Sequence, residues 1–164
     1  YLPEDRQKQG LILDWGLGQN VTLSTLEKFT KFTVINRKAE RERSKELLEK
    51  VKTKALSVFD KASSLSGGNQ QKVIVAKVLN SDLKVVILDE PTKGVDVGAK
   101  AQIYEIMSEL AAQGFGVIMI SSEMPEVLGM ADTILVMKEG RVSKIFADAT
   151  GVTQEQILEA AMKM

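Results

Sequence analysis

Two short runs of residues carry the groups that could do chemistry in this chain. The first, Leu65 to Lys72, places a hydroxyl, two glycines and two amides at the expected start of a helix. A helix N-terminus presents unpaired backbone N–H groups, which favour an anion such as a phosphate. The second, Val85 to Glu90, is apolar and ends in two adjacent carboxylates, Asp89 and Glu90, which suit a metal ion and a water. In this order, the two runs predict a phosphate-handling ATPase.

Composition narrows the class of protein further. The 164 residues are 44% hydrophobic, which is enough for one globular unit of ordinary size. Lys plus Arg and Asp plus Glu both number 22, and no clustered positive excess marks a nucleic-acid surface. The absence of Cys and His excludes disulfides, thiolate chemistry and an imidazole base within this chain. Carboxylates, hydroxyls, amides and backbone groups must therefore supply the chemistry.

The spacing of apolar residues predicts a helical part followed by an alternating helix and strand part. Helices are expected over 22–32, 37–56, 67–80, 99–113, 125–129 and 153–162. Strands are expected over 84–88, 117–120, 133–137 and 142–146. The alternating order in the middle of the chain is typical of a parallel sheet with crossover helices. No apolar run approaches the length of about 20 residues that crosses a bilayer.

The ends of the predicted strands bring the polar residues into one region. Ligands of parallel α/β sheets lie beyond the carboxyl ends of the strands, where Asp89, Glu90, Ser121 and Ser122 are expected. An apolar strand ending in Asp and then Glu suits two roles. The first carboxylate holds Mg²⁺, usually through water, and the second orients and activates an attacking water.

The ordered motifs resemble those of the ABC ATPases over nearly the whole chain. The run LSGGNQQK, Leu65 to Lys72, resembles their signature loop, VVILDE, Val85 to Glu90, resembles their Walker B strand, and Gly94 to Asp96 resembles their D-loop. The Asn-Gln-Gln form of the signature, together with Glu4-Asp5-Arg6, resembles the second nucleotide-binding half of bacterial monosaccharide importers of the ribose, xylose and galactose type.

This resemblance implies an α/β fold, a truncated P-loop-NTPase-like core with a small helical subdomain. The implied parts are a Q-loop-like opening segment at 1–18, a helical subdomain at 19–80 ending in the signature loop and helix, and a RecA-like core part at 81–164. It also implies ATP and Mg²⁺ as cofactors and a cytoplasmic location on the inner face of the cell membrane. The implied partners are a second nucleotide-binding half, membrane-embedded permease subunits and, indirectly, a sugar-binding protein, with no nucleic acid.

The resemblance also assigns roles to individual residues. Glu90 takes the catalytic position and Asp89 the metal position. Seven residues of the signature and D-loop would contact the nucleotide held by the partner half: Leu65, Ser66, Gly67, Gly68, Asn69, Gln70 and Asp96. The alternative, in which the motif is only a serine cap before a glycine turn with no ligand, is less favoured because the carboxylate strand follows it.

Three departures from the family pattern are informative. No GxxxxGK(S/T) phosphate loop occurs in the sequence, so we expect a truncated chain that does not hydrolyse ATP alone. Ser122 stands where the family carries a switch histidine, and Glu4 stands where a glutamine is usual. Serine cannot share positive charge with a transition state. The hypothesis is that this half has a catalytically weakened site and mainly completes the partner's site.

Two other classes of protein fit parts of the pattern. Chromosome-maintenance and DNA-repair ATPases share the order of motifs, but they carry a long coiled coil, and only 37–56 is available here. A non-catalytic interaction module is the third reading. The apolar loop around Leu11, Leu13, Trp15 and Leu17 fits either core packing or a permease contact.

Overall fold

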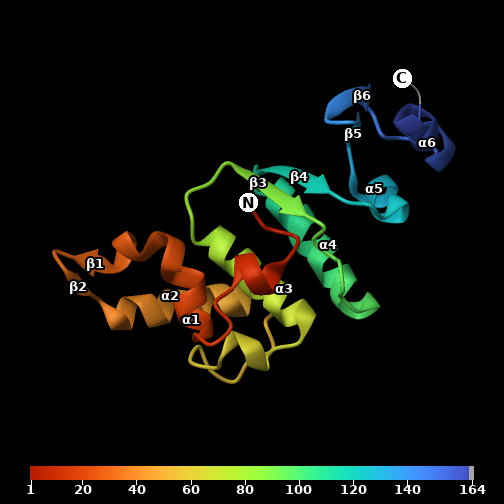
Figure 1. The fold of residues 1–164 in the computed structure, drawn as a ribbon. Coiled ribbons are helices and arrows are strands. Elements are labelled where there is room, and N and C mark those ends of the chain that lie inside the picture. The colour runs from red at the N-terminus through yellow and green to blue at the C-terminus, as the bar shows by residue number, and fades with distance from the viewer. Residues whose placement is uncertain (163–164) are drawn as a thin grey trace. The chain divides into compact units, whose positions relative to one another are not determined.

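The structure is a computed structural model, and it describes residues 1–162. The chain forms two compact units, Tyr1–Ile120 and the remainder from Ser121, and each is described by itself (Figure 1). Within residues 1–162, no helix is long and apolar enough to cross a membrane.

The first unit contains a helical part and a parallel sheet. Its helical elements are the π-helical turn η1 (Arg6–Gly10), α1 (Leu17–Thr22), the 3₁₀ helix η2 (Leu23–Phe29), α2 (Arg37–Lys50), the 3₁₀ turn η3 (Ala62–Ser64) and α3 (Gly67–Leu79). A small antiparallel hairpin, β1 (Thr30–Lys31) and β2 (Val34–Ile35), precedes α2. Figure 1 shows α1, α2 and α3 grouped together, and all three pack against one another.

The helix expected over 22–32 has different bounds. A helix begins earlier, at Leu17, changes to 3₁₀ geometry at Leu23 and ends at Phe29 before the hairpin. Thr25 has non-helical dihedrals, and its hydroxyl donates to the Thr22 carbonyl oxygen at 3.3 Å. Threonine hydroxyls that bond nearby carbonyls compete with the regular helical ladder, which explains the break.

The helix expected to reach Leu56 ends at Lys50, because the chain there adopts a Schellman cap. Lys52 has a φ of 53°, its N–H donates to Glu49 O at 2.9 Å, and the Thr53 N–H donates to Leu48 O at 2.9 Å. These are the two bonds that close such a cap, which usually has glycine at the left-handed position. Because Lys52 and not glycine occupies this position, the sequence did not indicate that the helix ends here.

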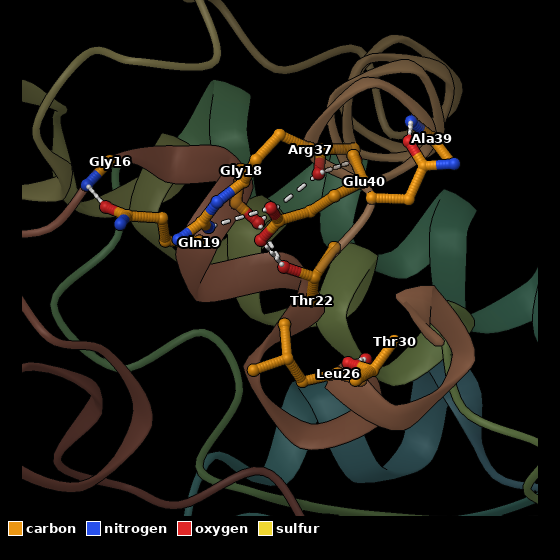
Figure 2. A network of polar contacts seen from close by, with 11 residues as sticks. Gly16, Gly18, Gln19, Thr22, Leu26, Thr30, Arg37, Ala39 and Glu40 are labelled. Carbon is orange, nitrogen blue, oxygen red and sulfur yellow. Dashed lines mark hydrogen bonds and ion pairs between the residues drawn. The ribbon is translucent and has the colours of Figure 1, made fainter. Parts of the chain in front are cut away.

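A polar network inside the helical part joins α1 to α2 (Figure 2). The buried Glu40 carboxylate accepts a hydrogen bond from Thr22 Oγ1 at 3.0 Å, and it forms an ion pair with Arg37, also at 3.0 Å. The Ser44 hydroxyl donates to Glu40 O of its own helix at 2.7 Å, and Gly18 O of α1 lies 3.3 Å from it as a second acceptor. The surrounding core is apolar, and its fully buried members include Leu17, Val21, Leu47 and Val73.

The apolar loop before α1 divides between core and surface. Leu11 and Leu17 are buried, as the core-packing reading predicts, whereas Trp15 is 41% exposed. The Trp15 backbone N–H donates to Ile12 O at 3.0 Å in the turn between them.

The parallel sheet positions the carboxylates. Strand β3 (Val85–Asp89) pairs in parallel with β4 (Gly116–Ile120), and Asp89 lies opposite Ile120. Leu2 adds a single parallel bridge on β3, since its N–H donates to Ile87 O at 2.8 Å and its carbonyl accepts from Asp89 N at 2.9 Å. Helix α4 (Val97–Ala112) connects the two strands and packs against β4. This confirms the predicted strand, helix, strand unit.

The second unit is a hairpin covered by helices. It contains α5 (Met124–Met130), β5 (Ile134–Lys138), β6 (Arg141–Phe146) and α6 (Gln154–Met162), with a small core of Ile134, Val136, Ile157 and Ala160. The turn residues Glu139 and Gly140 both have positive φ, as a tight hairpin requires. Strand β5 pairs antiparallel with β6. The expectation that the strand over 133–137 continues the parallel sheet stays a prediction, because this strand and β4 belong to different units.

Candidate functional site

The start of α3 presents a hydroxyl that does not cap its own helix. Ser66 occupies the N-cap position with extended backbone, and its carbonyl accepts the first helical bond from Gln70 N at 2.9 Å. Its side chain accepts no hydrogen bond from a backbone N–H of the first turn; instead, Ser66 Oγ accepts one from the Asn69 side chain, through Nδ2, at 2.9 Å. A helix of 13 residues thus begins with an uncapped first turn, which suits an anion.

Both glycines of the motif have close neighbours. A Cβ on Gly67 would lie 2.5 Å from Arg6 Nη2, and a Cβ on Gly68 would lie 2.5 Å from the Ala99 Cβ of α4. Real Cβ atoms do not approach other atoms this closely. The glycines therefore let Arg6 and α4 lie directly against the start of α3.

The amides that follow the glycines differ in their surroundings. Gln70 is 3% exposed, and its Nε2 donates to Ala62 O at 3.1 Å while its Oε1 accepts from Gln7 Nε2 at 3.3 Å. Asn69 is half-buried and lies beside the exposed Ser66. The structure thus separates two residues that the resemblance grouped as nucleotide contacts: the buried Gln70 side chain bonds Ala62 O in the loop at 62–66, and Asn69 lies beside the Ser66 hydroxyl.

Lys72 is a buried cation in the same motif. Its Nζ donates to Lys52 O at 2.8 Å, at the C-terminal cap of α2, where a positive charge is favourable. Burial lowers the pKa of Lys72, and the nearby charges of Lys54 and Lys52 lower it further. This side chain fastens α3 to the end of α2.

The end of β3 holds the two carboxylates in different ways. Asp89 Oδ2 accepts a hydrogen bond from the Tyr1 hydroxyl at 2.7 Å, and this bond is the main reason that the pKa of Tyr1 is raised. Glu90 has a φ of 46°, and its N–H donates to Ile120 O at 2.9 Å. Left-handed backbone at a residue other than glycine costs about 1 kcal/mol or more and is often found at functional sites.

The opening loop is fastened to the loop that follows β3. Glu4 forms an ion pair with Lys93, and the hydrogen bond from Lys93 to Glu4 raises the pKa of Lys93. The Arg6 guanidinium donates to Lys93 O at 2.8 Å and to Gly94 O at 3.4 Å. Since Arg6 also lies over Gly67, it connects the signature loop with the segment from Gly94.

The D-loop-like segment lies beside the signature. Gly94 has a φ of 66°, its carbonyl oxygen would be 3.3 Å from a Cβ on Gly67, and Asp96 caps α4 by accepting from Ala99 N at 3.0 Å. The structure therefore brings the start of α3, the 94–96 segment and the opening loop together. Sequence reasoning named Glu4 and Asp89 but missed three contacts at this site: Tyr1 with Asp89, Arg6 with Lys93 O, and Lys93 with Glu4. Each of these contacts spans more than 80 residues of chain.

Ser121 and Ser122 belong to the second unit. The Ser121 hydroxyl donates to the buried Glu126 carboxylate and accepts from Glu123 N at 3.0 Å, so it is engaged at the start of α5. The expected grouping of these serines with Asp89 and Glu90 stays a prediction.

The donor set fits a magnesium ion that arrives with a nucleotide. Among residues 1–162, no group of three or more metal-binding side chains forms a cage. The adjacent oxygen donors of Asp89 and Glu90 are what Mg²⁺ uses when waters and phosphate oxygens complete its coordination.

Comparison with known proteins defines the class. A sequence profile of the ABC transporter family matches residues 7–93, just over half of the chain, and the chain therefore belongs to this family. The ATP-binding cassette MJ0796, solved as a dimer bound to ADP and Pi, superposes with a TM-score of 0.73 and 23% identity. That match covers 89% of this chain and 62% of MJ0796, and it confirms the α/β ABC ATPase fold.

The relatives in sequence are ATP-binding proteins of sugar importers. The xylose import ATP-binding protein XylG of Geobacillus kaustophilus is 50% identical over 98% of this chain and 32% of its own length. The ribose import ATP-binding protein RbsA 2 of Rubrobacter xylanophilus is 47% identical over 98% of this chain and 31% of its own length. The chain thus spans about a third of these relatives. The finer prediction, the C-terminal part of a second nucleotide-binding domain, is not confirmed by these matches.

Proposed function

We propose that this chain is part of an ATP-binding subunit that energises the import of a monosaccharide such as xylose or ribose. The observation that carries the nucleotide-binding part is the uncapped start of α3, where Ser66, Gly67 and Gly68 lie beside the 94–96 segment. The sugar is inferred from the relatives, which are named for xylose and ribose import.

The roles of the carboxylates follow their positions at the end of β3. Asp89 would hold Mg²⁺ and Glu90 would orient the attacking water; bound MgATP would supply the phosphoryl group and the metal's charge. The left-handed backbone of Glu90, anchored to Ile120 O, supports this role because it fixes the direction in which the chain leaves the strand.

The residues divide between two nucleotides in this proposal. Ser66, Gly67, Gly68 and Asp96 contact the nucleotide held by a partner half, with Leu65 and Asn69 beside them and Gln70 supporting them from within. Glu4, Asp89, Glu90 and Ser122 belong to the nucleotide of this half. Glu4 is already paired with Lys93, and a serine at 122 offers no positive charge, so this site is the weaker of the two.

The proposed partners are a second nucleotide-binding half, permease subunits and, indirectly, a sugar-binding protein, with the complex on the cytoplasmic face of the membrane. The proposed parts remain an opening segment at 1–18, a helical subdomain at 19–80 and a core part at 81–164. A DNA-repair ATPase gains no support, because α2 has only 14 residues where a long coiled coil would be needed.

Turnover by the assembled importer tests the division of roles. We expect Glu90→Gln in this half to leave a substantial part of the ATPase rate, and the equivalent change in the partner half to abolish it. If Glu90→Gln stopped all turnover while the partner's change did not, the division would be wrong.

A further inference from the structure

We infer that Asn69 is a positioning residue that makes the Ser66 hydroxyl a hydrogen-bond donor toward the nucleotide. This rests on the proposed function, in which Ser66 contacts a phosphate.

The orientation of the Asn69 amide is fixed by a backbone group. Asn69 Oδ1 accepts a hydrogen bond from Lys54 N at 2.9 Å, and Asn69 Nδ2 donates to Ser66 Oγ at 2.9 Å. A backbone N–H can only donate, so the amide oxygen must face Lys54. The amide nitrogen must then face Ser66.

This orientation determines the direction of the serine proton. A hydroxyl has one proton to donate and two lone pairs to accept with. Since Ser66 Oγ accepts from the Asn69 side chain, its proton must point elsewhere, and the oxygen accepts no capping bond from the backbone of α3. A deprotonated phosphate oxygen needs donors, so a Ser66 hydroxyl held in this way is matched to an anion.

The loop that fixes Asn69 is itself held by α3. Lys54 follows the Schellman cap of α2, and Lys72, one turn after Asn69, donates to Lys52 O at 2.8 Å. Asn69 and Lys72 therefore hold the same loop from the same helix, but only Asn69 contacts Ser66. Lys72 supplies the matched control for a purely structural role.

A double-mutant cycle in the assembled importer tests the inference. The KM for MgATP and the kcat are measured for Asn69→Ala, Ser66→Ala and the double variant. We expect each single change to raise the KM or lower the kcat by about tenfold or more, the size of a lost charge-assisted hydrogen bond. The double variant should be no worse than Ser66→Ala, because both changes remove the same donor. By contrast, the fold-change in KM or kcat caused by Lys72→Met should multiply with the fold-change caused by Ser66→Ala.

Each outcome decides a separate point. If Ser66→Ala leaves both constants unchanged, the proposed function fails. A different result is that Ser66→Ala impairs the constants and that adding Asn69→Ala to it impairs them again, by the same factor as Asn69→Ala alone. In that case the proposed function stands and this inference is overturned. Asn69→Asp keeps the acceptor toward Lys54 but also accepts the serine proton, so we expect a larger loss than for Asn69→Ala. Wild-type constants for Asn69→Asp would equally overturn the inference.

Discussion

At the scale of single residues, the charged groups of the opening loop are held by partners far along the chain. Glu4 and Lys93 pair across 89 positions, and Arg6 reaches the carbonyl oxygens of Lys93 and Gly94. Glu4 occupies the position where the family carries a glutamine, so its pairing bears directly on the proposed weakness of this site.

A pKa measurement tests the pairing of Glu4. The hydrogen bond to Glu4 raises the pKa of Lys93 above its ordinary value of 10.5, with the charges of Glu4 and Glu90 adding to it. We expect Glu4→Gln to lower the pKa of Lys93. NMR titration of the Lys93 side chain measures this pKa. Asp5→Asn, which changes a carboxylate paired with Lys8, is the control and should leave Lys93 unchanged.

The sign of the associated stability effect follows. A lysine with a raised pKa in the folded state contributes its stabilisation fully below pH 10.5 and loses it as the pH rises through the folded pKa. The contribution is small because the pair is exposed. A Lys93 pKa that did not move in Glu4→Gln would show that the pair is not formed in solution.

Residue types alone predicted the chemistry but not its neighbours. The hydroxyl, glycines and carboxylates of the two motifs were evident because their spacing along the chain is short. Tyr1 on Asp89 and Arg6 over Gly67 were not, since no periodicity links residues so far apart. For Gln70, the residue type was misleading: this polar residue of the motif was expected to contact a nucleotide, but its side chain is buried and bonded within the chain.

At the scale of elements, α1 and α2 are joined by a buried carboxylate. Glu40 accepts from Thr22 and pairs with Arg37 (Figure 2). We expect Glu40→Ala to lower the free energy of unfolding by about 1–3 kcal/mol, since Arg37 loses its partner and the buried Thr22 hydroxyl loses one of its two acceptors and keeps only Gly18 O. Urea denaturation measures this. Glu42→Ala, at an exposed position of the same helix, should change it by less than about 0.5 kcal/mol.

The two glycines of the signature give a matched pair of variants. Gly68→Ala would press a new methyl group against Ala99, whose Cβ cannot move without its helix, so we expect about 1–3 kcal/mol of destabilisation. Gly67→Ala meets the end of the flexible Arg6 side chain and should cost less. Thermal unfolding of both variants decides this, and equal losses would mean that α3 and α4 are not in close contact.

Element types were predictable where the apolar pattern was strong. Strands β3 and β4 and helices α3 and α4 lie within two residues of their expected bounds. The end of α2 was missed because its cap uses Lys52 and not glycine, and the break after α1 was missed because threonine hydroxyls interrupt an otherwise helical pattern. The pairing of β5 with β6 follows from the tight turn between them, which the sequence shows as Glu139-Gly140.

At the scale of the whole molecule, the chain carries the signature and the carboxylate strand of an ABC ATPase but no phosphate loop within its 164 residues. We expect the isolated chain to bind MgATP very weakly, because nothing in it replaces the glycine-rich cradle of backbone N–H groups. Isothermal titration calorimetry measures this, and micromolar affinity would contradict it.

The central claim is that Ser66 contacts a nucleotide held by a partner half, and the absence of cysteine makes it directly measurable. Ser66→Cys places a single thiol of this chain at the site, and Ser64→Cys places one on an exposed control position nearby. The rate of thiol labelling is measured with and without MgATP, in the isolated chain and in the assembled importer. The account predicts that MgATP slows labelling at position 66 only in the assembled importer and leaves position 64 unaffected. Equal labelling of position 66 with and without MgATP in the assembled importer, or protection already complete in the isolated chain, would contradict it.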